Sequence, residues 1–104
     1  MNYRLSYSDQ FWEDFASALR YTVMELKNPI AANALNDALN SAVQTVAAFP
    51  NAMPAWRGAG SRETVYRSVS VKSYLAFYVV TGDTVEFRRF LSGASDLSTQ
   101  LTED

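Results

Sequence analysis

The basic side chains that lie in or beside strand-like segments are the residues of this chain best suited to chemistry. Guanidinium groups bind phosphate and carboxylate groups through paired hydrogen bonds, and lysine adds a compact point charge. Arg67 and Arg89 each interrupt a row of alternating apolar residues, and a charge on such a face needs a partner or a route to solvent. The residues that we select as candidates for contact with a target are Arg67, Lys72, Arg88, Arg89 and Trp56.

Two interpretations of Arg67 and Arg89 follow from their residue type. In the first, they form a cationic patch that binds phosphate or carboxylate groups. In the second, they are held in salt bridges at the margin of the core, with Asp9, Glu13 or Asp96 as partners. Residue chemistry alone favours the salt bridges, and Arg67, Arg89 and Lys72 are only weak candidates for catalysis.

The composition excludes several classes of site. The 104 residues predict one domain, spanning residues 1–104, with a single modest core. The chain has no cysteine and no histidine, which removes thiolate catalysis, disulfides and the commonest general base and metal ligand. We therefore expect no metal and no cofactor. The net charge of −2 argues against extensive contact with nucleic-acid phosphates.

No targeting or membrane segment is evident in the sequence. No apolar run approaches the ~20 residues that a membrane span needs. The first residues also lack the apolar centre of a signal peptide. We therefore expect a cytoplasmic protein with no membrane partner.

Two helices are predicted in the first half of the chain. Residues 2–7 alternate as a short strand, and Ser8 or Asp9 can then cap a helix over residues 9–26. Asn28 and Pro29 are typical of the start of a second helix, which Pro50 ends. The short connection between them predicts an antiparallel helical hairpin. The expected apolar faces are Phe11, Phe15, Leu19, Val23 and Leu26 on the first helix, and Ala31, Leu35, Ala38, Ala42, Val46 and Phe49 on the second.

Three strands are predicted after a loop at residues 51–62. The first covers residues 64–71, and residues 74–91 form two more, joined by a turn in which Gly82 tolerates positive φ. The order β-α-α-β-β-β predicts an α+β fold with the helical hairpin packed on one face of a mainly antiparallel sheet. The expected apolar rows of the last two strands are Leu75, Phe77 and Val79, then Val85, Phe87 and Leu91.

The ordered set of these segments resembles the RelE/ParE superfamily of toxins from type II toxin–antitoxin systems, over nearly the whole chain. The resemblance lies in the opening strand, the Asn-Pro helix start, the Pro-containing loop and the strands that carry the arginines. The matching stretches are YRLSYS, LKNPIAANALNDAL, VAAFPNAMP, VYRSVSVKSYLAFYVV and VEFRRFLSGASDL.

The resemblance implies one of two activities. RelE-like members are mRNA endonucleases that cut in the ribosomal A site, using basic residues of the sheet and a Tyr or His near the C-terminus. ParE-like members inhibit DNA gyrase by protein–protein contact. Arg67, Lys72 and Arg89 match basic positions of the motif. The departures are Ser92 where relatives carry His or Tyr, Ala94 and Ser95 where Arg is common, and Leu97 in place of an aromatic residue.

These departures favour the ParE-like activity. RNA cleavage needs a proton acceptor, a proton donor and a cationic stabiliser, and the last strand lacks an evident acid or base. If the chain is an enzyme, another residue must serve: Tyr66, Tyr74, Tyr78, Glu86 or a lysine.

We therefore expect a growth-inhibiting toxin that binds gyrase, of the type used in plasmid stabilization. Its partner would be a cognate antitoxin, lying across the helices and sheet as a helix or added strand in a toxin–antitoxin hetero-oligomer. The alternatives are a ribosome-dependent mRNA endonuclease and an antitoxin-binding module without toxicity.

Overall fold

The computed structural model describes residues 3–56 and 65–93. These residues form two helices and one five-stranded sheet with the strand order β1-β5-β4-β3-β2. β1 runs parallel to β5, and the other neighbours are antiparallel. The predicted α+β fold with a mainly antiparallel sheet is confirmed, with a short strand β2 added inside the expected loop. The elements are β1 (Arg4–Tyr7), α1 (Asp9–Met24), α2 (Pro29–Ala48), β2 (Ala55–Trp56), β3 (Tyr66–Val71), β4 (Tyr74–Thr81) and β5 (Thr84–Ser92).

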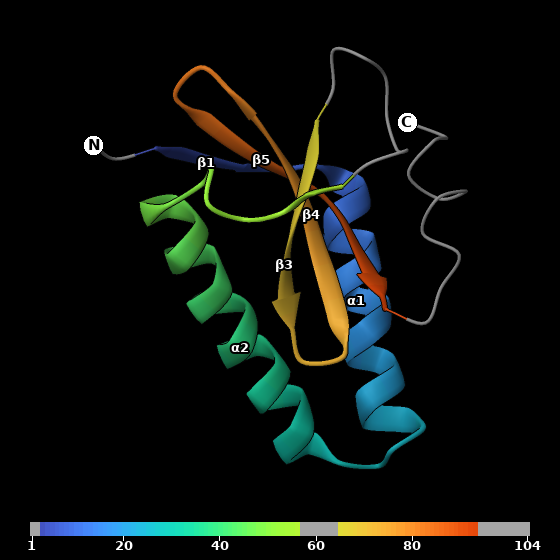
Figure 1. Cartoon of the computed structure of the whole chain (residues 1–104). Helices are drawn as coiled ribbons and strands as arrows, with labels where there is room; N and C mark the ends of the chain where they lie inside the picture. Colours follow the sequence, from blue (N-terminus) through green and yellow to red (C-terminus); the bar gives the residue numbers. More distant parts are fainter. Residues whose placement is uncertain (1–2, 57–64, 94–104) are drawn as a thin grey trace.

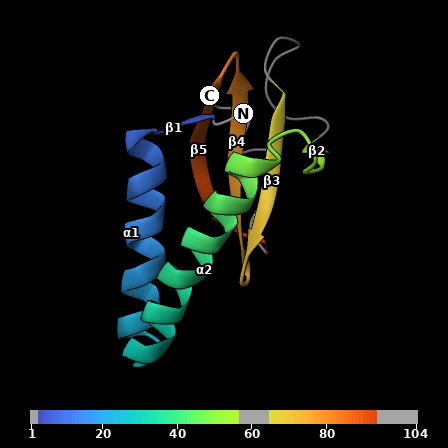
Figure 2. The ribbon, with the colours of Figure 1, turned by 90° about the vertical axis from the view of Figure 1, so that its left-hand side faces the viewer.

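Both helices cover the same face of the sheet (Figures 1 and 2). The main core lies between them and that face, and aromatic rings dominate the part beneath α1. Phe11 of α1 contacts Phe87 and Phe90 of β5 with ring centroids 5.7 and 5.9 Å apart, a spacing typical of favourable aromatic pairs. The helical hairpin is thus fixed to β5, the strand that carries Arg88 and Arg89.

The N-termini of both helices are capped by side chains. Ser8 Oγ accepts a hydrogen bond from the Phe11 amide at 3.0 Å, and Asn28 Oδ1 accepts one from the Ala31 amide at 3.1 Å. Pro29 takes the first helical position, where its missing N–H costs nothing. The helix starts predicted from the sequence are confirmed.

The buried faces of the helices differ in part from the predicted ones. On α1 the buried residues are Phe11, Phe15, Ala18 and Thr22, because a 3.6-residue period turns the later predicted positions outward. Val23 and Leu26 are 44% and 57% exposed, which corrects the prediction for the end of this helix. On α2 the prediction is wrong for Phe49, which is 64% exposed at the C-cap. The residues of α2 that are buried are Leu35, Leu39, Ala42, Val43 and Val46.

A β-bulge changes the facing of side chains along β5. Phe77 of β4 pairs with Arg89 and Tyr78 pairs with Phe87, so Arg88 is an extra residue in β5. Phe87 therefore faces the helices, whereas Leu91 packs on the opposite face. The predicted single row of Val85, Phe87 and Leu91 is wrong, because the bulge breaks the two-residue period.

The face of the sheet away from the helices carries a second apolar cluster. The row predicted on β4 is real, but it lies on this outer face, and Ala76 and Tyr78 face the helices instead. Tyr66 and Phe77 have no exposed surface. The outer cluster consists of Tyr66, Phe77, Val79 and Leu91, with Leu75 at its margin.

Neither helix within the described ranges is long and apolar enough to cross a membrane.

Candidate functional site

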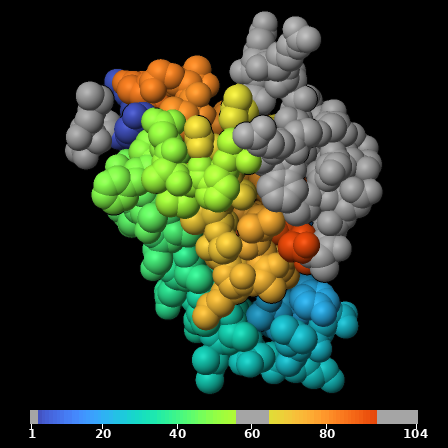
Figure 3. Space-filling model, viewed as in Figure 1, coloured from blue at the N-terminus to red at the C-terminus, as the bar shows by residue number. Residues whose placement is uncertain are grey.

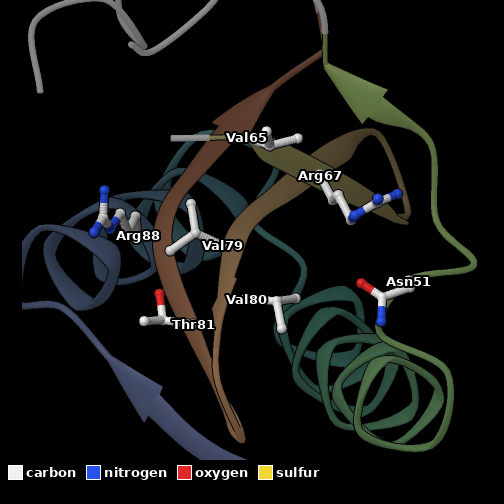
Figure 4. A pocket seen from close by; sticks show the side chains of 7 residues that line it. All are labelled: Asn51, Val65, Arg67, Val79, Val80, Thr81 and Arg88. Atoms are coloured by element: carbon white, nitrogen blue, oxygen red, sulfur yellow. The ribbon is translucent and has the colours of Figure 1, made fainter. Parts of the chain in front are cut away.

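A polar cavity lies where β3 and β4 diverge, and it is our candidate site. Among the described residues, β3 pairs with β4 as far as Arg67 and Tyr78, and β4 continues beyond that pair to Thr81. The cavity has a volume of about 230 Å³. In Figure 4, Arg67 and Asn51 approach it from one side of β4, whereas Arg88 projects from the other side. The lining residues are Asn51, Val65, Arg67, Val79, Val80, Thr81 and Arg88.

Arg67 and Tyr78 hold the segment that follows α2. Arg67 Nη1 donates a hydrogen bond to the Met53 carbonyl at 2.6 Å, and the Tyr78 hydroxyl donates one to the Pro50 carbonyl at 2.6 Å. Within the described residues, Arg67 forms no ion pair. Its charge is therefore not neutralised by a described carboxylate, and its second terminal nitrogen remains for a ligand.

Tyr78 is not suited to act as a base. It has no exposed surface, and burial raises the pKa of Tyr78 to about 12, while the nearby Arg67 lowers it by a smaller amount. The phenol is therefore protonated at neutral pH and acts as a hydrogen-bond donor.

Arg88, the bulge residue, is bound on the outer face of the sheet. Its Nε donates to Glu86 Oε1 at 2.6 Å. That hydrogen bond raises the pKa of Arg88, and a further hydrogen bond with Tyr66 contributes in the same direction. Arg88 and Glu86 are each about one third exposed, at 34% and 37% of their side chains. The bulge thus brings a carboxylate, a guanidinium and a buried phenol together.

Arg89 is paired with Asp14 of α1. Its Nε lies 2.8 Å from Asp14 Oδ2, and the same oxygen accepts the backbone N–H of Phe90 at 3.0 Å. Only 13% of the Arg89 side chain and 11% of the Asp14 side chain are exposed. The pair lies beyond the last pairing of β1 with β5, Tyr7 with Phe87. Asp14 therefore caps an edge of β5 that the described part of β1 does not reach.

Asp14, the described partner of Arg89, is not among the acidic residues proposed from the sequence. Asp9, Glu13 and Asp96 were the acidic candidates, and Asp96 lies outside the described residues. Asp14 stands three residues after Phe11 and beside Phe15, so helical geometry places it at the margin of the buried face. The available signal for this ion pair was an acidic residue at the margin of the buried helix face, together with an arginine in an apolar strand that needed a partner.

Lys72 lies far from the other basic candidates. It occupies the turn between β3 and β4, at the opposite end of β3 from Arg67, with φ at 58°. The backbone of Trp56 pairs with Tyr66, and its side chain lies outside what the structure describes. The structure brings Arg67 and Arg88 to one cavity, while Lys72 and Arg89 lie elsewhere.

The remaining candidates for proton transfer are distributed over both faces of the sheet. Tyr66 is buried on the outer face, and Tyr74 stacks on Phe90 with ring centroids 5.0 Å apart. Burial raises the pKa of Tyr74, and the nearby Tyr21 adds to the shift. Ser92 ends β5, and Ala94, Ser95 and Leu97 lie outside the described residues. In residues 3–56 and 65–93, no cluster of acidic side chains could hold a metal ion.

Comparison with known proteins identifies the class of this chain. The family model of the ParE toxin of the type II toxin–antitoxin system, parDE, matches residues 5–97. The chain therefore belongs to the ParE toxin family, and the resemblance found in the sequence is confirmed on its ParE-like side.

A solved structure has the same fold. It is described as "Chromosomal ParDE TA system from P. aeruginosa", and it superposes with a TM-score of 0.68 at 16% sequence identity. The match covers 86% of this chain and 95% of the other. No curated protein sequence matches the chain closely enough to add a finding.

Proposed function

We propose that this chain inhibits growth by binding DNA gyrase, and that a cognate antitoxin neutralises it in a toxin–antitoxin hetero-oligomer. The observation that carries the proposal is membership of the ParE toxin family over residues 5–97. ParE-like toxins, as a class, act by protein–protein contact with gyrase.

The chemistry of the described site supports contact rather than cleavage. RNA cleavage by 2′-OH attack requires a base and an acid placed around a cation. The hydroxyl next to Arg67 belongs to Tyr78, whose pKa is raised to about 12 and which already donates to Pro50. Glu86 is bound by Arg88. Tyr78 and Glu86 are thus held by hydrogen bonds and are poorly suited to transfer a proton.

We expect the purified protein to inhibit DNA supercoiling by gyrase. The assay follows relaxed plasmid with gyrase, ATP and increasing amounts of the protein, and the expected result is plasmid that stays relaxed. Gyrase that remains fully active at saturating protein would sink the assignment of the target.

The two alternatives are separated by measurements in cells. Primer extension on transcripts after induction should reveal no new cleavage sites, and new sites would support the endonuclease. Normal growth after expression without an antitoxin would support the binding module. Co-expression of the cognate antitoxin should restore growth.

Arg67→Ala should weaken inhibition of gyrase by about tenfold or more, as expected when a charged side chain is removed from the centre of a contact. The reason is that Arg67 lines the cavity and has no acidic partner among the described residues. The measurement is the concentration that halves supercoiling, together with the melting temperature.

The matched control for this variant is Arg4→Ala. It removes the same charge from a side chain that is 82% exposed and whose nearest described carboxylate, on Asp83, is 3.7 Å away. Equal inhibition by Arg67→Ala and the wild-type protein would exclude Arg67 from the contact. A loss of inhibition that is fully explained by a lowered melting temperature would show that Arg67 only stabilises the segment at Met53.

A further inference from the structure

A second, mainly apolar groove lies at the other end of the molecule, where the two helices join. In Figures 1 and 2 the turn between β3 and β4 stops above the connection of α1 to α2, and Figure 3 shows residues of both helices projecting beyond that turn. The cavity there has a volume of about 290 Å³. We call it the hairpin-end groove, and its lining residues are Tyr21, Thr22, Leu26, Ala31, Ala34, Leu35, Lys72, Ser73 and Tyr74.

Large apolar side chains around this groove are exposed. Tyr21 and Leu26 line it and are 53% and 57% exposed, and Met24 and Ile30, close by in the chain, are 69% and 78% exposed. The apolar stripe of α1 thus continues past Thr22, the last residue of the helix that is buried. Contiguous exposed apolar surface on a protein of this size is typical of a contact with another protein.

Both lysines of the chain lie at this end. The sequence contains only Lys27 and Lys72. Lys72 lines the groove, and Lys27 follows Leu26 directly. Both are exposed, and neither forms an ion pair within the described residues. Among the described residues, the lining of the groove includes Lys72 and no carboxylate, so the lining is positively charged. The exposed Glu25, which precedes Leu26 in the chain, lies outside that lining.

The backbone at both lysines is also unusual. Lys27 and Lys72 have φ values of 51° and 58°, and they are the non-glycine residues with positive φ in the described ranges. Glycine is the residue that usually takes this conformation after a helix and in tight turns. Lysine pays a steric cost there that glycine avoids. Lysine in place of glycine at both positions therefore points to a use for the side chain.

We propose that the hairpin-end groove binds an acidic peptide segment of another protein. The segment inserts one large apolar side chain between the ends of the two helices and Tyr74, and it places carboxylates next to Lys72 and Lys27. The volume of about 290 Å³ falls just below the ~300–1,000 Å³ of small-molecule sites and suits a side chain. The inference goes beyond the proposed function, because it holds for any protein with such a segment and does not require gyrase to be the target.

The test is selection of a random peptide library, displayed on phage, against the intact protein. Enriched peptides should combine aspartate or glutamate with a large apolar residue. One such peptide, synthesised with a fluorescent label, is then titrated with the protein by fluorescence anisotropy. An unenriched library, or enriched peptides without acidic residues, would overturn the proposal.

The decisive variants keep the fold and change the groove. Lys27→Gly combined with Lys72→Gly suits the local backbone, so the melting temperature should stay close to that of the wild type while the peptide binds about tenfold or more weakly. Ala34→Leu fills the groove with a good helix former and should abolish binding. Arg4→Gln removes a positive charge elsewhere and should leave binding unchanged.

Two results would contradict the proposal that an acidic peptide segment binds in the hairpin-end groove. Equal binding by the wild-type protein and the double glycine variant would remove the role of the lysines. A concentration-dependent dimer of the wild-type protein in sedimentation velocity, lost in Ala34→Leu, would show that a second copy of the chain fills the groove instead.

Discussion

Replacing Asp14 with alanine should lower the free energy of unfolding by about 3–5 kcal/mol, the usual cost of breaking a buried ion pair by removing one of its members. One oxygen of Asp14 accepts from Arg89 Nε at 2.8 Å and from the Phe90 amide at 3.0 Å. Both charged side chains are almost completely buried, at 11% and 13% exposure. The variant therefore loses the acceptor for the strand edge and the ion pair with Arg89.

Urea unfolding followed by circular dichroism measures this loss. Small domains are stable by only about 5–15 kcal/mol, so the midpoint should fall steeply. Asp14→Asn keeps an oxygen for the Phe90 amide and should lose less. The double variant Asp14→Ala with Arg89→Met should recover part of the loss, because the cost of burying the guanidinium charge is removed as well. A cost below about 1 kcal/mol would place this pair among weak surface pairs.

A further variant, Arg89→Ala, decides what Arg89 does. In Arg89→Ala, growth inhibition should fall only in proportion to the lost stability if the arginine is a structural member of this pair. Lost inhibition with an unchanged melting temperature would make Arg89 a contact residue. The comparison is informative because Asp14 is largely buried beside it and offers no contact of its own.

The helix starts and the element order were predictable because they depend on local chemistry. Asn28 followed by Pro29 specifies a capped helix start whatever the rest of the chain does. The alternation of Leu75, Phe77 and Val79 also predicted a strand correctly. It did not reveal which face the helices would cover, since both faces of β4 carry apolar residues.

The bulge at Arg88 could not be predicted from the pattern. An extra residue in β5 preserves the composition of the strand and changes only its phase, so Leu91 moves to the outer face without any local signal. The two arginines of the predicted cationic patch lie apart, because Arg67 lines the cavity and Arg89 is paired with Asp14. Arg88 is bound on the outer face by Glu86, whereas the neighbouring Arg89 reaches Asp14 on α1. The left-handed backbone at Lys27 and Lys72 could likewise not be predicted, because glycine or asparagine is the residue that usually indicates positive φ.

Tyr78→Phe should lower the free energy of unfolding by about 1–3 kcal/mol at neutral pH, because it leaves the buried Pro50 carbonyl without its donor. The Tyr78 hydroxyl donates to that carbonyl at 2.6 Å, and the ring has no exposed surface. The ring itself stays, so no cavity forms and the loss reports the hydroxyl group. Tyr21→Phe, at a side chain that is 53% exposed, is the control and should change stability little.

The same variant should also change the alkaline limit of stability. Burial raises the pKa of Tyr78 from 10.0 to about 12, so the unfolded chain releases this proton at a lower pH than the folded chain does. The stabilisation is complete below pH ~10 and is lost as the pH rises to ~12, an effect of about 2–3 kcal/mol. In urea titrations from pH ~8 to ~12, the wild type should therefore lose more stability than Tyr78→Phe, and the two curves should converge. Parallel curves would show that this phenol ionises alike in both states and that its hydrogen bond to Pro50 is weak.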